Sequence, residues 1–132
     1  METLINPAKM YTYQLKSDII LASWAYELSV ESMEFLNSVK ELFQFAKELN
    51  LKKILIDSGT PAGGVLTEDV MLLIQESIVN VAAEKIALLE TSDFHWDNNL
   101  LQFFKYLKNF LQLSYEVRLF SNKQKALDWL SV

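Results

Sequence analysis

The sequence predicts a single-domain α/β protein with a mostly parallel sheet of about five strands. Two apolar runs of strand length, residues 53–57 and 85–89, each begin at a lysine and lead through a polar loop into an amphipathic helical pattern. All three glycines lie in the loop after the first run. The expected order is strand, strand, helix and then three strand–helix pairs, which is typical of βαβ units with right-handed crossovers. The order of the strands stays open.

The chain opens with a predicted antiparallel hairpin. Residues 10–16 alternate between apolar and polar side chains, with one face formed by Tyr11, Tyr13 and Leu15. After the polar break at 17–18, residues 19–24 are more evenly apolar, so the first strand is expected nearer the sheet edge. Residues 1–9 are expected to form a loosely ordered N-terminal extension of the domain, which otherwise spans the whole chain.

Residues 31–49 predict the first long helix, because apolar residues recur there at spacings of three and four. Ser29 or Ser32 is the expected N-cap, and Asn50 suits a left-handed residue that ends the helix. Phe45 falls among the polar positions of this helix. We expect it at a contact surface or as a partly covered rim aromatic.

The strand at 53–57 is predicted to lie in the middle of the sheet, and the loop after it concentrates conformational freedom. Gly59, Gly63, Gly64 and Pro61 all fall within this loop, so positive φ angles are easiest to reach there. Open α/β sheets usually bind ligands at the carboxyl ends of their strands. The loop is therefore expected to contact a ligand or partner through backbone N–H groups, with a purely structural turn as the alternative.

The second half of the chain continues the alternation of strand and helix. Thr67 is expected to cap a helix that begins with two acids, which suit the positive end of the helix dipole. Residues 85–89 predict a second parallel strand, and residues 98–113 predict a helix with an unusually broad apolar arc. Residues 115–120 predict the last strand, and Asn122 is expected to cap a short closing helix.

Composition excludes several classes of function. Seventeen acidic and twelve basic residues give a net charge of −5 without a local basic cluster, which argues against nucleic acid as a partner. The absence of cysteine excludes disulfides, thiolate chemistry and Cys-rich zinc sites. No apolar run approaches the length of a membrane span, and the start of the chain lacks the pattern of a signal peptide. We therefore expect a cytoplasmic protein without a membrane span.

The glycine-bearing loop does not match a nucleotide-binding motif. Gly59 and Gly64 have the glycine spacing of a Walker loop, but Val65 and Leu66 stand where the lysine and hydroxyl residue are required. Nothing there would neutralise β- and γ-phosphates or hold magnesium. The glycine spacing of a dinucleotide fingerprint is absent as well. No cofactor is expected.

The single histidine, His95, lies between Asp93 and Asp97 in a predicted loop after the second parallel strand. A metal site needs three or four converging ligands and a catalytic histidine needs a neighbouring reactive group, so no metal is expected. Asp97 is equally suited to cap the next helix. Because Asp57 and Ser58 end the neighbouring strand in this interpretation, they would share one crevice with Asp93 and His95, and hydrolysis at His95 is a further hypothesis.

Three apolar segments carry a resemblance to the STAS / SpoIIAA-like family: Ile54-Leu55-Ile56-Asp57, Lys85-Ile86-Ala87-Leu88-Leu89, and Val117-Arg118-Leu119-Phe120 followed by Ala126-Leu127-Asp128-Trp129-Leu130. The resemblance covers residues 10–130 and rests mostly on hydrophobic pattern. It implies a small non-enzymatic module. Some members of the family are anti-sigma-factor antagonists switched by phosphorylation where the helix after the central strand begins, and others bind nucleotides or lipids.

The chain departs from the phosphorylated pattern of that family. In that pattern, an Asp-Ser/Thr pair and a glycine lie at the start of the helix. Here the Asp57-Ser58-Gly59 triplet lies at the end of the strand, with Ser58 nine residues before Thr67. The two acids after Thr67 would repel an added phosphate. Ser58 and Thr67 are kept as candidate phosphorylation sites together with Thr60, and turn and cap roles are the alternative for each.

These observations predict an interaction or regulatory module, not an enzyme, that contacts a protein partner or a second copy of itself. The contact is expected at loop 58–67 and the adjacent apolar helix surface. The candidate contact residues are Asp57, Ser58, Gly59, Thr60, Gly63, Gly64, Thr67, Asp93 and His95. The alternative is a binder of an apolar or lipid-like small molecule, suggested by Phe103, Phe104, Tyr106, Phe110, Trp24, Trp96 and Trp129.

Overall fold

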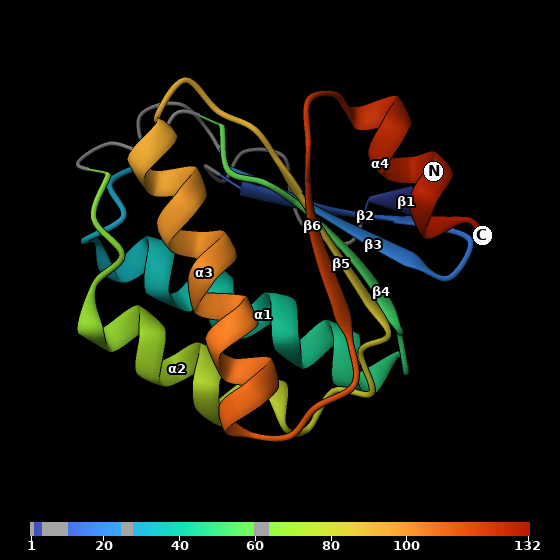
Figure 1. Ribbon diagram of the computed structural model, residues 1–132, viewed down its shortest axis with the longest axis horizontal. Coiled ribbons are helices and arrows are strands. Elements are labelled where there is room, and N and C mark those ends of the chain that lie inside the picture. Colours follow the sequence, from blue (N-terminus) through green and yellow to red (C-terminus); the bar gives the residue numbers. More distant parts are fainter. Residues whose placement is uncertain (1, 4–10, 25–27, 60–63) are drawn as a thin grey trace.

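The computed structural model describes residues 2–3, 11–24, 28–59 and 64–132. In this part of the chain, six strands form one sheet in sequential order (Figure 1). They are β1 (Glu2–Thr3), β2 (Tyr11–Lys16), β3 (Ile19–Trp24), β4 (Lys53–Asp57), β5 (Lys85–Leu89) and β6 (Glu116–Phe120). The first two pairings are antiparallel and the other three are parallel. The predicted α/β fold class with a mostly parallel sheet is confirmed.

Strand β1 is an addition to the expected architecture. The sequence interpretation placed residues 1–9 in a loose extension, but Glu2 and Thr3 pair with Leu15 and Gln14 of β2. A two-residue strand has no detectable periodicity, so its sequence carries no signal. The two edge strands of the described sheet are therefore β1, which pairs with β2, and β6, which pairs with β5.

Four helices are described: α1 (Met33–Glu48), α2 (Glu68–Ile78), α3 (Phe94–Phe110) and α4 (Lys123–Leu130). Three of their N-caps are among the residues that the sequence indicated. Ser32, Thr67 and Asn122 each accept a hydrogen bond from the backbone N–H three residues later. Asn50 has a φ of 51°, so it terminates α1 in the left-handed region as expected.

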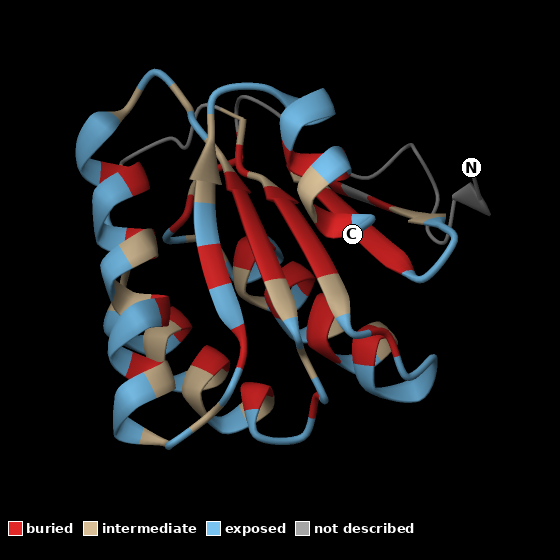
Figure 2. Cartoon of the chain, turned by 45° about the vertical axis from the view of Figure 1, so that its right-hand side comes forward, coloured by how far each residue is buried: buried red, intermediate tan, exposed pale blue. Residues whose placement is uncertain are grey.

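Strand β4 lies in the middle of the sheet, between β3 and β5. Ile54, Leu55 and Ile56 are buried on both faces of the sheet, whereas the terminal residues are half-buried (Figure 2). A parallel strand covered on both sides reads as a continuous apolar run because neither face meets water. This confirms the central position that the sequence predicts for residues 53–57.

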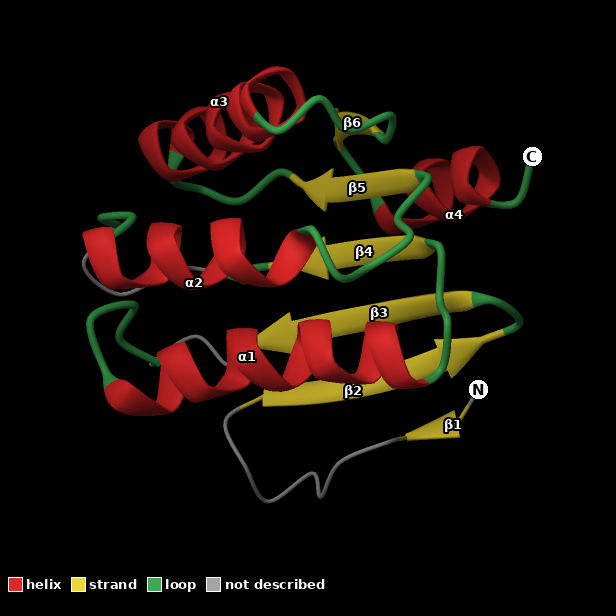
Figure 3. Ribbon diagram, turned by 90° about the horizontal axis from the view of Figure 1, so that it is seen from below, coloured by secondary structure: helices red, strands yellow, loops and turns green. Residues whose placement is uncertain are grey.

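Helices cover the two faces of the sheet unequally. Helices α1, α2 and α3 lie in order across one face and α4 lies on the other (Figures 1 and 3). Each face of the sheet has its own hydrophobic core. Because side chains alternate along a strand, Ile54 and Ile56 of β4 lie in the larger core, and Leu55 lies in the smaller core beneath α4. Phe45 of α1 is half-buried in the larger core and meets the ring of Tyr13 edge-on at 5.5 Å. It is therefore a covered rim aromatic.

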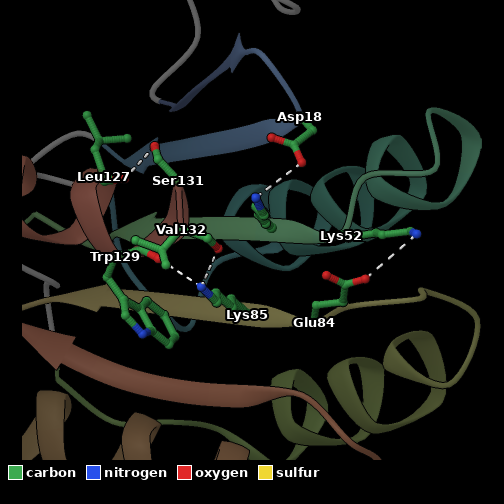
Figure 4. A network of polar contacts seen from close by, with 9 residues as sticks. Asp18, Lys52, Glu84, Lys85, Leu127, Trp129, Ser131 and Val132 are labelled. Carbon is green, nitrogen blue, oxygen red and sulfur yellow. Dashed lines mark hydrogen bonds and ion pairs between the residues drawn. The ribbon is translucent and has the colours of Figure 1, made fainter.

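Lys85 fastens the carboxyl end of α4 to the sheet. Its Nζ donates hydrogen bonds of 2.9 Å to the carbonyl oxygens of both Trp129 and Val132 (Figure 4). A cation at this position satisfies carbonyl groups that lack partners inside the helix and complements the negative end of the helix dipole. The ammonium also lies 5.2 Å from the Trp129 ring centroid, a cation–π arrangement.

Two buried tyrosines make polar contacts inside the larger core. The Tyr13 hydroxyl donates to the carbonyl oxygen of Ser38, and the Tyr115 hydroxyl donates to that of Phe104 at 2.5 Å. Burial raises the pKa of Tyr115 to about 12. Burial, with the nearby carboxylate of Glu41, raises the pKa of Tyr13 further above its ordinary value.

These pKa shifts predict alkaline unfolding. The unfolded tyrosines ionise near pH 10, so above that pH the unfolded chain binds fewer protons and the free energy of unfolding falls as pH rises. The loss from Tyr115 should continue to about pH 12. Denaturant unfolding across this range, with phenolate absorbance, measures it. Tyr13→Phe and Tyr115→Phe should each flatten the pH dependence; an unchanged profile in both variants would contradict this explanation.

Candidate functional site

The candidate site lies at the end of the sheet where the carboxyl ends of β4 and β5 meet. Two segments meet there: the loop that follows Asp57 and leads to α2, and residues 90–93, which lead from β5 to α3. Because β4 and β5 are adjacent and parallel, both segments leave the sheet on the same side. Thr60 and Gly63, two of the predicted contact residues, fall outside the described residues.

The first turn of the loop packs tightly against β3. The Asp57 carboxylate accepts a hydrogen bond of 3.2 Å from the Gly59 N–H, which closes an Asx turn. Gly59 has a φ of 67°, and a Cβ there would lie 2.8 Å from the backbone oxygen of Trp24. Only glycine fits this position without displacing the backbone at the end of β3.

The end of the loop packs against the start of α3. Gly64 has a φ of 59°, and a Cβ there would lie 2.4 Å from Oδ2 of Asp93. The other carboxylate oxygen of Asp93 accepts a hydrogen bond of 3.0 Å from the Trp96 N–H, so Asp93 is the N-cap of α3. The two loops therefore touch, and the adjacency of Gly64 and Asp93 agrees with the strand pairing that the sequence suggested.

Helix α3 begins four residues earlier than the sequence interpretation placed it. His95, expected in a loop, lies exposed in the first turn of α3, with its ring 5.9 Å from that of Phe94. Asp97, considered as an N-cap, is instead buried within the helix. It accepts hydrogen bonds of 2.8 Å from the Thr91 N–H and 2.7 Å from the Thr91 hydroxyl. Asp97 thus ties the segment after β5 to α3.

A small apolar cavity lies under this edge, between the sheet and helices α1, α2 and α3. Its volume is about 20 Å³, and its lining includes Ser58, Leu66, Trp24, Trp96, Phe35 and Phe104. Room of this size holds about one water molecule. The buried Trp96 Nε1 has no hydrogen-bond acceptor among the described residues, whereas Trp24 Nε1 donates to the Ser38 hydroxyl at 2.6 Å. Neither Asp57 nor His95 lines the cavity.

The two hydroxyl groups singled out for phosphorylation have structural positions. Ser58 is buried and faces the apolar cavity. The Thr67 hydroxyl accepts a hydrogen bond of 3.3 Å from the Val70 N–H and caps α2. Both observations agree with the turn and cap roles that were the alternative interpretation.

An apolar surface lies on the flank of α3 that faces α2. The opposite flank, with Phe94 and Asn98, lines a hollow of about 230 Å³ beside Leu119 of β6. Because a helix turns about 100° per residue, Tyr106 and Phe110 lie on the α2 side. They are 52% and 58% exposed, and their rings stack at 5.4 Å with an interplanar angle of 11°.

Helix α2 adds two exposed apolar side chains. Ser77 and Asn80 line a hollow with residues of α1, which identifies the flank of α2 that faces α1. By the same helical turn, Leu72 and Val79 point outward and away from α1. Each is 52% exposed. We call Leu72, Val79, Tyr106 and Phe110 the α2–α3 face. The broad apolar arc in the sequence indicated its α3 half, but the outward position of Leu72 and Val79 had no separate signal.

Comparisons with known proteins found no relative of this chain. No family model, no curated protein and no solved structure matches the chain. The resemblance to the STAS / SpoIIAA-like family therefore stays a prediction. Within the described ranges, no group of three or more His, Cys, Asp or Glu side chains is placed to hold a metal ion. None of the helices in those ranges is long and apolar enough to cross a membrane.

Proposed function

We propose that the protein is a small interaction module, not an enzyme, that binds an amphipathic helix of a partner protein on its α2–α3 face. The observation that carries this proposal is the stacked pair of Tyr106 and Phe110. Two adjoining aromatic rings, each more than half exposed, are costly to leave in water and are frequent anchors in protein interfaces. Leu72 of α2 and Val79, its C-cap, add two exposed apolar side chains on the neighbouring helix.

The charge on the α2 half of this face specifies the chemistry of the partner, whereas α3 carries Lys105 and Lys108. Helix α2 carries three acidic residues, Glu68, Asp69 and Glu76, and no basic residue. The whole chain has a net charge of −5. A helix with an apolar stripe and a basic flank along α2 would match both the rings and the acids of α2, since complementary charge speeds encounter and disfavours other partners.

The glycine-bearing loop supports this function by positioning α2. Its described end, from Gly64, packs against Asp93, and Thr67 then caps α2. Val65, in the same stretch, is 53% exposed. The described end of the loop thereby holds the start of α2 against the start of α3.

The two other functions suggested by the sequence gain less support. Small-molecule pockets typically enclose about 300–1,000 Å³. The apolar cavity under the loop measures about 20 Å³, so it offers no room for a lipid-like ligand. Hydrolysis would need a nucleophile or a substrate-binding group beside the His95 ring. His95 is exposed, and among the described residues the aromatic neighbour of its ring is Phe94.

A designed peptide tests the proposal. The probe is a labelled helical peptide with leucines on one face and lysines on the other, and fluorescence anisotropy measures its dissociation constant. Tyr106→Ser combined with Phe110→Ser should weaken binding at least roughly tenfold, because interface aromatics contribute more than most contacts. Both side chains are exposed, so the variant should keep its melting temperature.

Phe94→Ser provides a matched control. Phe94 is also an exposed aromatic of α3, 75% accessible, but it lies on the flank toward β6. The control should bind the peptide as the unchanged protein does. A glutamate version of the peptide should bind more weakly than the lysine version. Equal binding by the double variant, or equal binding of both peptides, would overturn the proposal.

A further inference from the structure

Strand β6 leaves one row of backbone groups open at the edge of the sheet. Among the described strands it pairs only with β5. The Glu116 N–H donates to the Glu84 oxygen and the Glu90 N–H donates to the Phe120 oxygen, each at 2.9 Å. Successive residues of a strand point their backbone groups to opposite sides. The N–H and C=O groups of Val117 and Leu119 therefore face outward.

The exposed charges of β6 have opposite signs and share one face. Glu116 and Arg118 both project on the α4 side, where Arg118 lies 5.1 Å from the Trp129 ring centroid. Their side chains are 56% and 57% exposed and approach within 3.5 Å. Charges on an edge strand usually discourage pairing with another chain. An alternation of acid and base behaves differently, because it is complementary to itself when the strand is reversed.

We propose that two copies of the protein associate through antiparallel pairing of their β6 strands, with Val117 opposite Val117 of the second copy. The outward N–H and C=O groups of Val117 then pair with each other across a two-fold axis. Glu116 lies opposite Arg118 of the second copy, and Arg118 lies opposite its Glu116. Two such ion pairs form at non-hydrogen-bonded positions, where side chains are closest.

Charge selects this register over its neighbours. A two-fold axis at Arg118 would place the two guanidinium groups directly opposite each other, which is destabilising. An axis at Leu119 would place Glu116 opposite Asn122 and leave no ion pair between Glu116 and Arg118. Among the described residues, the strand at the opposite edge, β1, has only two residues, fewer than the five of β6. The β6 edge lies away from the α2–α3 face, so this association is independent of helix binding.

Charge exchange tests the pairing. Sedimentation equilibrium of the unchanged protein, whose mass is 15.2 kDa, should show a concentration-dependent dimer. Glu116→Arg alone or Arg118→Glu alone should raise the dissociation constant of the dimer at least roughly tenfold, because like charges then face each other twice. The two changes together should restore the dimer. Glu48→Arg and Lys40→Glu, on exposed positions of α1, are controls that change charge equally and should not affect association.

Cysteine cross-linking fixes the register independently, since the natural chain contains no cysteine. Opposed residues at non-hydrogen-bonded positions have Cα atoms about 4.5 Å apart, within reach of a disulfide. A mixture of Glu116→Cys and Arg118→Cys chains should therefore cross-link on oxidation, whereas neither chain alone should. A monomer at every soluble concentration, equal cross-linking in the single-chain samples, or a dimer unaffected by the charge changes would overturn the proposal.

Discussion

Gly59→Ala is expected to lower the free energy of unfolding by about 3 kcal/mol. A non-glycine residue in the left-handed region costs about 1–2 kcal/mol. The added Cβ would also lie 2.8 Å from the Trp24 backbone oxygen, and Trp24 is paired with Tyr11 of β2. A shift of the end of β3 would disturb this pairing. Urea unfolding monitored by tryptophan fluorescence measures this loss.

Gly64→Ala is the matched comparison. Its φ is also positive, but the atom nearest to the added Cβ belongs to the Asp93 side chain, which can rotate. We expect a loss of about 1–2 kcal/mol, mostly from the backbone conformation and the weakened N-cap of α3. An equal or smaller loss for Gly59→Ala than for Gly64→Ala would contradict the inferred tight packing of the loop against β3.

Asp97→Ala is expected to cost about 3 kcal/mol. The buried Asp97 carboxylate accepts two hydrogen bonds from Thr91, through its N–H and its hydroxyl. Hydrogen bonds to a charged group contribute about 1.5–3 kcal/mol each, and the alanine variant leaves the Thr91 N–H without its acceptor. Thermal or urea unfolding measures the change.

Asp97→Asn separates this hydrogen bonding from general packing. The asparagine carbonyl can still accept from the Thr91 N–H, so roughly half of the loss should be recovered. The alternative role of Asp97, an N-cap, is filled by Asp93 in the structure. If Asp97→Ala were tolerated and Asp93→Ala were equally harmless, the account of how α3 is joined to the sheet edge would be wrong.

Sequence periodicity predicted the strands and helices other than β1, and the central position of β4. Apolar runs such as 54–56 identify buried strands because both faces of a parallel sheet exclude water. Cap residues located the helix starts at Thr67 and Asn122, and the structure selects Ser32 over Ser29 for α1. These side chains satisfy N–H groups left free by the first helical turn.

The start of α3 shows where this reasoning fails. Asp93 and Asp97 are both suitable caps, and the three residues after Asp93 have poor helix propensity. Tertiary packing decides between them: Trp96 is buried against Phe35, at 6.1 Å between ring centroids, which draws the preceding turn into the helix. Strand order and the open β6 edge were also beyond the sequence, because periodicity reports which face a residue occupies and not which strand lies beside it.

Mapping where the lysine-bearing peptide binds tests whether the α2–α3 face binds a basic amphipathic helix. Backbone amide NMR signals of the ¹⁵N-labelled protein are followed during a titration with the unlabelled peptide. We expect the largest shifts around Leu72 and Val79, at α2 and its C-cap, and around Tyr106 and Phe110 of α3. Shifts concentrated at His95 and Ser58 or along β6, or no shifts at saturating peptide, would contradict it.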